Sequence, residues 1–134
     1  MSRRTLARLQ GVYFIATGVW PLVSIRTFEA VTGPKADRWL VKTVGVLVAV
    51  IGASLALEGR RPAAPTTVLA VGSAAGLGAV DLIYATRGRI SRVYLLDAVV
   101  EALLVSAWML SRTSARPGES RAPQAIAALR TLQR

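Results

Sequence analysis

Apolar residues form four long, continuous blocks along the chain, and short polar stretches rich in Arg separate them. The blocks cover about residues 7–26, 38–58, 65–86 and 92–111. Each is close to the roughly 20 residues that an α-helix needs to cross a bilayer. Apolar and polar residues do not alternate as they would in a membrane β-barrel. The pattern therefore predicts an all-α integral membrane four-helix bundle with antiparallel up-down topology and both termini on the same side.

Composition narrows the classes of function. Of the 134 residues, 53% are hydrophobic and the mean hydropathy is +0.47, which is typical of a membrane protein. The chain has no Cys and no His, so disulfides, thiolate metal sites and His-based acid–base chemistry are excluded. We expect neither a metal nor a cofactor. Residues 1–111 form the predicted membrane domain, and residues 112–134 form a basic, largely flexible tail with a short surface helix.

Positive charges flank the apolar blocks instead of forming one basic surface. The net charge is +10, and its distribution favours contact with anionic lipid head groups over nucleic acid. The side of the termini carries Arg3, Arg4, Arg8, Arg60, Arg61, Arg112 and Arg116, and the other side carries Arg26, Lys35, Arg38, Arg87, Arg89 and Arg92. This balance favours a multi-pass protein of the bacterial inner membrane with cytoplasmic termini.

Small residues recur at helical spacing in the second and third blocks. Gly45 and Gly52 lie on one stripe of the second block, and Gly72 and Gly76 form a step on the third. Such stripes let helix backbones approach closely in lipid. We expect them to pack helices within one chain, with a homodimer contact as the alternative.

Four ionisable residues lie inside the apolar blocks. Lys42 follows the start of the second block, Asp81 precedes the end of the third, and Asp97 and Glu101 follow the start of the fourth. These block ends lie on the same side of the predicted membrane, so the four groups share one half of the bilayer, with Glu101 deepest. Charges in hydrocarbon are costly and usually functional, so these residues are the candidate ligand-binding or proton-binding site.

Polar and aromatic side chains share helical faces with these charges. On the fourth block the shared face includes Asp97 and Glu101. The residues expected to form the walls of a cavity around the charges are Tyr13, Thr17, Trp20, Tyr94 and Trp108. The cavity would open toward the side of the membrane opposite the termini.

The balance of charge singles out Glu101. Lys42 can pair with Asp97 or Asp81 and offset part of the cost of their burial. Glu101 has no such partner, and low-dielectric surroundings and a neighbouring carboxylate both disfavour its ionised form. A protonated or proton-exchanging Glu101 is the resulting hypothesis. Structural alternatives are a Lys42 that extends to the head groups and an Asp81 that only accepts an interhelical hydrogen bond.

Two segments resemble parts of a known kind of protein. "FEAVTGPKADRWLVKTVG", residues 28–45, and "YLLDAVVEALL", residues 94–104, resemble segments of small uncharacterised bacterial integral membrane proteins with four helices. "GVYFIATGVW" and the number of helices have a looser likeness to DoxX-like proteins. Sterol isomerase-like membrane proteins also place acids inside the membrane. None of these resemblances implies an activity or a functional residue.

Three classes of function remain. An acid-lined cavity suits a protein that binds or transports a small cationic, lipid-like or proton-coupled ligand. An intramembrane enzyme, such as an isomerase of a lipid-like substrate, would use Glu101 and Asp97 as an acid–base pair. A structural subunit would pair its acids with cations of another membrane protein. The absence of a nucleotide-binding loop and of an activated nucleophile disfavours the enzyme, so binding or transport is the favoured class.

Overall fold

The computed structural model describes residues 1–58 and 62–111, and these residues form helices and no strands. The helices are α1 (Arg3–Val23), α2 (Ile25–Thr32), α3 (Arg38–Ala56), α4 (Ala64–Thr86) and α5 (Tyr94–Leu110). The all-helical class is therefore confirmed. By length and composition α1, α3 and α4 can each cross a membrane, which fits the predicted membrane protein. At 17 residues α5 stands at the lower limit for a span. The predicted tail lies outside the described residues.

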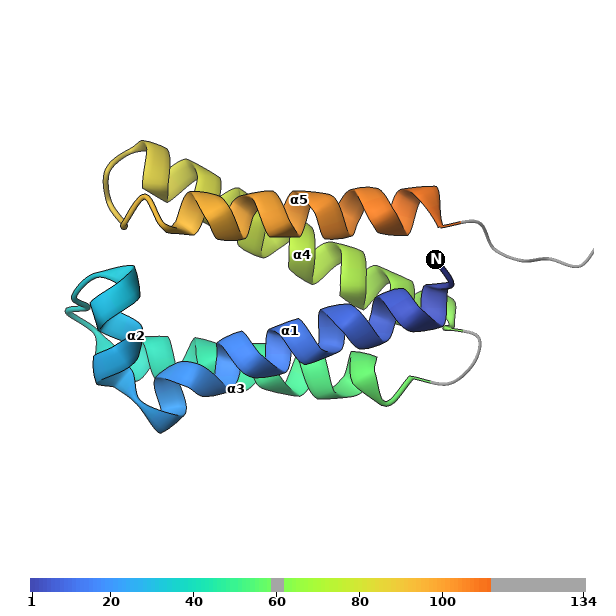
Figure 1. Cartoon of the computed structure of the whole chain (residues 1–134), viewed down its shortest axis with the longest axis horizontal. Coiled ribbons are helices and arrows are strands. Elements are labelled where there is room, and N and C mark those ends of the chain that lie inside the picture. The colour runs from blue at the N-terminus through green and yellow to red at the C-terminus, as the bar shows by residue number, and fades with distance from the viewer. Residues whose placement is uncertain (59–61, 112–134) are drawn as a thin grey trace, which may run out of the picture.

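The helices pack as two pairs. Helix α1 lies along α3, and α4 lies along α5, while α1 also contacts α5 (Figure 1). Figure 1 shows the chain running in opposite directions within each pair. The Nε of Arg3 donates to the backbone carbonyl of Ser111, 3.4 Å away, so the start of α1 and the end of α5 lie together. We call this end of the molecule the Arg3 end and the opposite one, where α2 lies, the α2 end.

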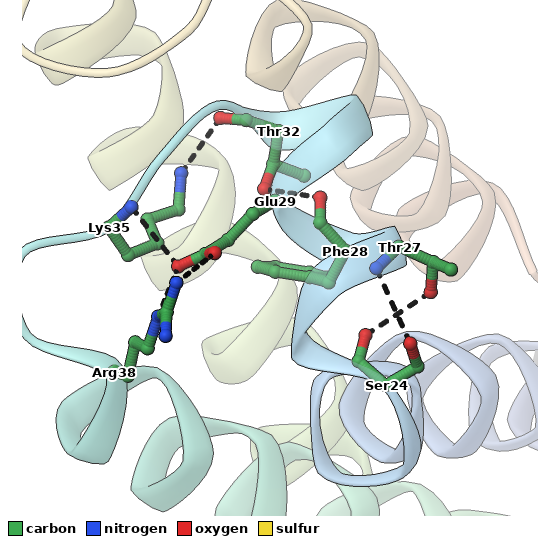
Figure 2. A network of polar contacts seen from close by, with 7 residues as sticks. All are labelled: Ser24, Thr27, Phe28, Glu29, Thr32, Lys35 and Arg38. Carbon is green, nitrogen blue, oxygen red and sulfur yellow. Dashed lines mark hydrogen bonds and ion pairs between the residues drawn. The ribbon is translucent and has the colours of Figure 1, made fainter.

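The first apolar block does not form a single helix to residue 26. Helix α1 ends at Val23, and Pro21 within its last turn removes one backbone donor. Ser24 has an extended backbone, and its side chain accepts a hydrogen bond from the Thr27 backbone N–H at 3.3 Å (Figure 2). This is an N-cap, so a new helix starts there. The segment that the pattern predicts as a connection is therefore the short helix α2.

Helices α1 and α3 touch through their backbones. A Cβ atom built on Gly11 would lie 2.6 Å from the Gly52 carbonyl oxygen, and one built on Gly18 would lie 2.5 Å from the Gly45 carbonyl oxygen. Neither position leaves room for a side chain. The helices can approach this closely only because glycine stands on both sides of the contact. Gly45 and Gly52 thus pack helices within the chain, as the sequence predicts.

Gly72 and Gly76 do not have this role. A Cβ atom on either residue would meet nothing within 4 Å. Neither glycine packs against another helix of the described residues, so the expected packing of helix α4 through Gly72 and Gly76 is wrong. Gly78 makes the contact instead, because a Cβ atom there would lie 2.9 Å from the Cβ of Glu101 on α5. The sequence contains both small-residue stripes but does not show which one faces the neighbouring helix.

Large apolar side chains cover the outside of the molecule. Leu103 is 65% exposed and Met109 is 75% exposed, and many Val, Leu and Ile side chains of α3 and α4 are similar. The buried apolar cluster is small and lies toward the Arg3 end; it consists of Leu6, Ala7, Leu55, Ala70 and Trp108. This distribution is unfavourable in water but suits helices surrounded by lipid, whose chains are as apolar as Leu.

The two types of glycine should respond to alanine in opposite ways. Gly52→Ala forces the α1 and α3 backbones apart and should lower the free energy of unfolding by about 1–3 kcal/mol. Gly72→Ala adds a methyl group in open space and should leave stability unchanged or raise it by up to about 1 kcal/mol, because Ala favours a helix over Gly. Unfolding in detergent micelles, followed by circular dichroism, measures both. Equal destabilisation by the two variants would contradict the described α1–α3 contact.

Candidate intramembrane acid site

Three acids meet between α4 and α5. Asp81 on α4 is 8% exposed and Glu101 on α5 is 1% exposed. Asp97 lies one turn before Glu101 on α5, and its side chain interacts with that of Asp81. The charges of Asp81 and Asp97 both act on Glu101. We call Asp81, Asp97 and Glu101 the acid site.

Helix α1 contributes a tyrosine to this site. The hydroxyl group of Tyr13 donates a hydrogen bond to Oδ1 of Asp97. Thr17, one turn further along α1, donates to the carbonyl oxygen of Tyr13 at 3.0 Å, so its hydroxyl is occupied within its own helix. Of the two residues predicted on this stripe, Tyr13 therefore reaches the acid site and Thr17 supports the helix that carries it.

Glu101 has an unpaired oxygen. Its Oε2 atom is buried and has no hydrogen-bond partner among the described residues. Glu101 can sit this deep because Gly78 has no side chain in its way. A buried polar atom without a partner costs roughly 1–3 kcal/mol, and more if it is charged. The position therefore favours a proton or a bound cation on Glu101.

Lys42 does not join the acid site. Its side chain is exposed on α3, and within residues 1–58 and 62–111 no ion pair links it to Asp81, Asp97 or Glu101. Lys42 lies away from the acid site because α3, which carries it, packs on α1 and makes little contact with α4. Arg26 is likewise exposed on α2. The expected cation within the site is thus not found in the described part of the chain.

Trp108 belongs to a different polar contact. Its Nε1 donates to Oε1 of Gln10 at 2.7 Å, and Nε2 of Gln10 donates to the Ala70 carbonyl at 2.8 Å. All three residues are buried. Gln10 therefore joins α1, α4 and α5 at the Arg3 end, and Trp108 is core instead of a cavity wall. The sequence could have indicated this contact, because the side-chain amide of Gln10 lies inside an apolar block and needs a hydrogen-bond partner on another helix.

The other two expected wall residues lie at the α2 end. Trp20 donates from Nε1 to the Thr27 hydroxyl at 2.9 Å and meets the Phe28 ring edge-on at 5.5 Å. The Nζ of Lys35 lies 4.9 Å from the centroid of the Tyr94 ring, within the range of a cation–π contact. Trp20 and Tyr94 therefore hold α2 and its following turn against α1 and α5.

A polar network fixes α2 to the start of α3 (Figure 2). Nε and Nη2 of Arg38 donate to the two carboxylate oxygens of Glu29 at 2.9 and 2.8 Å. The backbone N–H of Lys35 donates to the same carboxylate at 3.3 Å, and its Nζ donates to the Thr32 carbonyl at 2.7 Å. The hydrogen bond from Arg38 lowers the pKa of Glu29, and burial lowers the pKa of Lys35. Gly33, with a φ of +84°, makes the turn between them.

The chain matches no protein-family model, no curated protein and no solved structure. Its resemblance to small four-helix membrane proteins remains a prediction. No cluster of acids within the described ranges has an arrangement that could hold a metal ion. The chemistry of the site is therefore that of closely spaced carboxyl groups with a tyrosine hydroxyl in an apolar helix pair.

Removal of the Tyr13 hydroxyl should destabilise the protein. Tyr13→Phe loses the hydrogen bond to Asp97, and interhelical hydrogen bonds in membrane proteins contribute roughly 1 kcal/mol. Tyr84→Phe is the matched control, because Tyr84 is exposed on α4 and makes no side-chain hydrogen bond among the described residues. Reversible unfolding in micelles gives both values. An unchanged Tyr13→Phe protein would show that the hydroxyl does not join α1 to α5.

Acid should loosen α2. Because the pKa of Glu29 is lower in the folded protein than its ordinary value, the Glu29–Arg38 pair stabilises α2 at neutral pH and loses this effect as the pH falls through the lowered pKa. Arg38→Gln should therefore increase hydrogen exchange of residues 25–32 at neutral pH but change it little in acid. Arg87→Gln, an exposed change at the same end, should have no effect at either pH. A pH-independent effect of Arg38→Gln would rule out this role of the pair.

Proposed function

We propose that the protein crosses the membrane four times, through α1, α3, α4 and α5, and binds a small organic cation at the acid site in exchange for a proton. In this arrangement α2 lies at the membrane surface, and the Arg3 end, with both termini, faces the cytoplasm. The charge distribution supports this orientation, because Arg3, Arg4 and Arg8 lie at the start of α1. Although α5 has only 17 residues, its length and apolar composition fit a helix that crosses the hydrocarbon core.

The unpaired Oε2 of Glu101 is the observation that carries the proposal. It is buried, lies beside two further carboxyl groups, and forms no ion pair among the described residues. Burial in an apolar environment and neighbouring carboxyl groups disfavour the ionised form of Glu101, so we expect Glu101 to hold a proton when the site is empty. A bound cation compensates the negative charge and allows a proton to leave. Binding and proton release are therefore coupled.

The geometry also divides the roles of the three acids. The Asp97 carboxyl group accepts a hydrogen bond from Tyr13 and interacts with Asp81, so it already has two partners within the protein. Glu101 has no such bond at Oε2. We therefore assign Glu101 as the group that contacts the cation and exchanges the proton, and Asp81 and Asp97 as the groups that set its charge state. Tyr13 positions Asp97. The predicted pairing with Lys42 plays no part in this function.

Proton release from the purified protein in lipid nanodiscs tests the proposal. Ethylammonium chloride, added to a weakly buffered sample with a pH-sensitive dye, should release protons, whereas sodium chloride at equal ionic strength should not. Glu101→Gln should weaken ethylammonium binding by about 3 kcal/mol, roughly a hundredfold, because the compensating charge is lost. Asp37→Asn is the matched control: Asp37 precedes α3 and its side chain makes no capping hydrogen bond. Equal proton release by Glu101→Gln and the unaltered protein would overturn the proposal.

A further inference from the structure

An open groove runs between α4 and α5 and has a volume of about 610 Å³. Ala, Val, Leu and Gly form most of its surface, with Ser106 near one end. On α5 the lining extends from Leu95 to Ser106, a length of about 16 Å at the rise of an α-helix. Of the described residues that line the groove, only Glu101 carries a charge. The groove is therefore an open apolar recess with one ionisable residue, Glu101, in its lining.

Glu101 belongs to the groove and to the acid site at once. Glu101 lines the groove, whereas Asp81 and Asp97, whose charges act on Glu101, do not line it. Gly78 lines the groove opposite Glu101, and its lack of a side chain brings the two backbones together there. Several lining residues, such as Ala79 and Ala102, are exposed, so lipid can reach the groove directly. Glu101 itself is 1% exposed, so it belongs to the inner wall of the groove and not to its open rim.

We propose that this groove holds the alkyl chain of an amphiphilic cation whose ammonium group contacts Glu101. The inference rests on the proposed function and specifies its ligand as a single-chain alkylammonium compound taken from the bilayer. The apolar lining matches a hydrocarbon chain, the length allows an extended one, and the carboxyl group complements the ammonium charge. A helix of a second copy would fill the groove with apolar side chains and leave Oε2 of Glu101 without a partner, which is costly.

Chain length and groove shape provide the test. Binding of dodecylammonium and of ethylammonium is measured by proton release in nanodiscs. Ala102→Phe fills the groove, and it should weaken dodecylammonium binding by at least about tenfold while ethylammonium binding stays unchanged. Leu103→Phe is the matched control: Leu103 is the next residue on α5, is exposed and does not line the groove. This variant should bind both probes as the unaltered protein does.

The outcomes separate the two proposals. If neither probe releases protons, the proposed function itself is wrong. If both bind equally well and Ala102→Phe affects neither or both, the acid site binds a cation but the groove does not hold its chain. If Ala102→Phe changes the mass of the complex in detergent without an effect on dodecylammonium, the groove is a contact with a second copy and the inference is overturned.

A second variant keeps the test decisive if Ala102→Phe fails to fold. Ala79→Leu narrows the groove from the α4 side and should again weaken only dodecylammonium binding. Val80→Leu is its control, because Val80 is exposed on α4 outside the groove. Circular dichroism confirms folding of each variant. A folded Ala79→Leu protein that binds dodecylammonium normally would overturn the inference.

Discussion

The rest of the structure depends on the contact between the backbones of α1 and α3. Gly11 and Gly18 on α1 meet Gly52 and Gly45 on α3 so closely that no side chain fits between them. Lipid chains are as apolar as the helices, so the hydrophobic effect does not drive this association, and close packing of small residues must supply it. With one face of α1 fixed on α3, its Gln10 and Tyr13 side chains face α4 and α5. The position of the acid site therefore begins with glycines that lie outside it.

Hydrogen bonds join the two helix pairs at different depths. Gln10 connects α1 to α4 and α5 at the Arg3 end, and Tyr13 connects α1 to α5 at the acid site. At the α2 end, the turn after α2 places Lys35 over the ring of Tyr94. In hydrocarbon each of these polar groups would be costly if it stayed unpaired. The pairs are therefore held in one arrangement by the requirement that buried polar groups find partners. Among the described residues, Oε2 of Glu101 and Nε of Arg4 are buried without a hydrogen-bond partner.

The sequence predicts the helices and the gathering of the acids, but it does not predict which helix faces which. Helical spacing and block order are enough to place Asp97, Glu101 and Asp81 near one another. They cannot distinguish the Gly45/Gly52 stripe, which packs on α1, from the Gly72/Gly76 step, which faces outward. The same ambiguity explains why Lys42 was wrongly predicted in the acid site and Trp108 as a cavity wall. The sequence shows which residues share a face of one helix, but not which neighbouring helix that face contacts. Helix α2 was missed because its start depends on the backbone of Ser24, which periodicity does not reveal.

Gly78 shows why the acid site and the groove belong together. Its missing side chain allows Glu101 to lie between α4 and α5, and a larger residue there would push the two helices apart at that level. Gly78 and Glu101 both line the groove, and Glu101 is also the residue on which the charges of Asp81 and Asp97 act. In the proposed function, a cation in the groove and a proton would therefore compete for one carboxyl group. The coupling that we propose would thus depend on the close approach of the α4 and α5 backbones at Gly78.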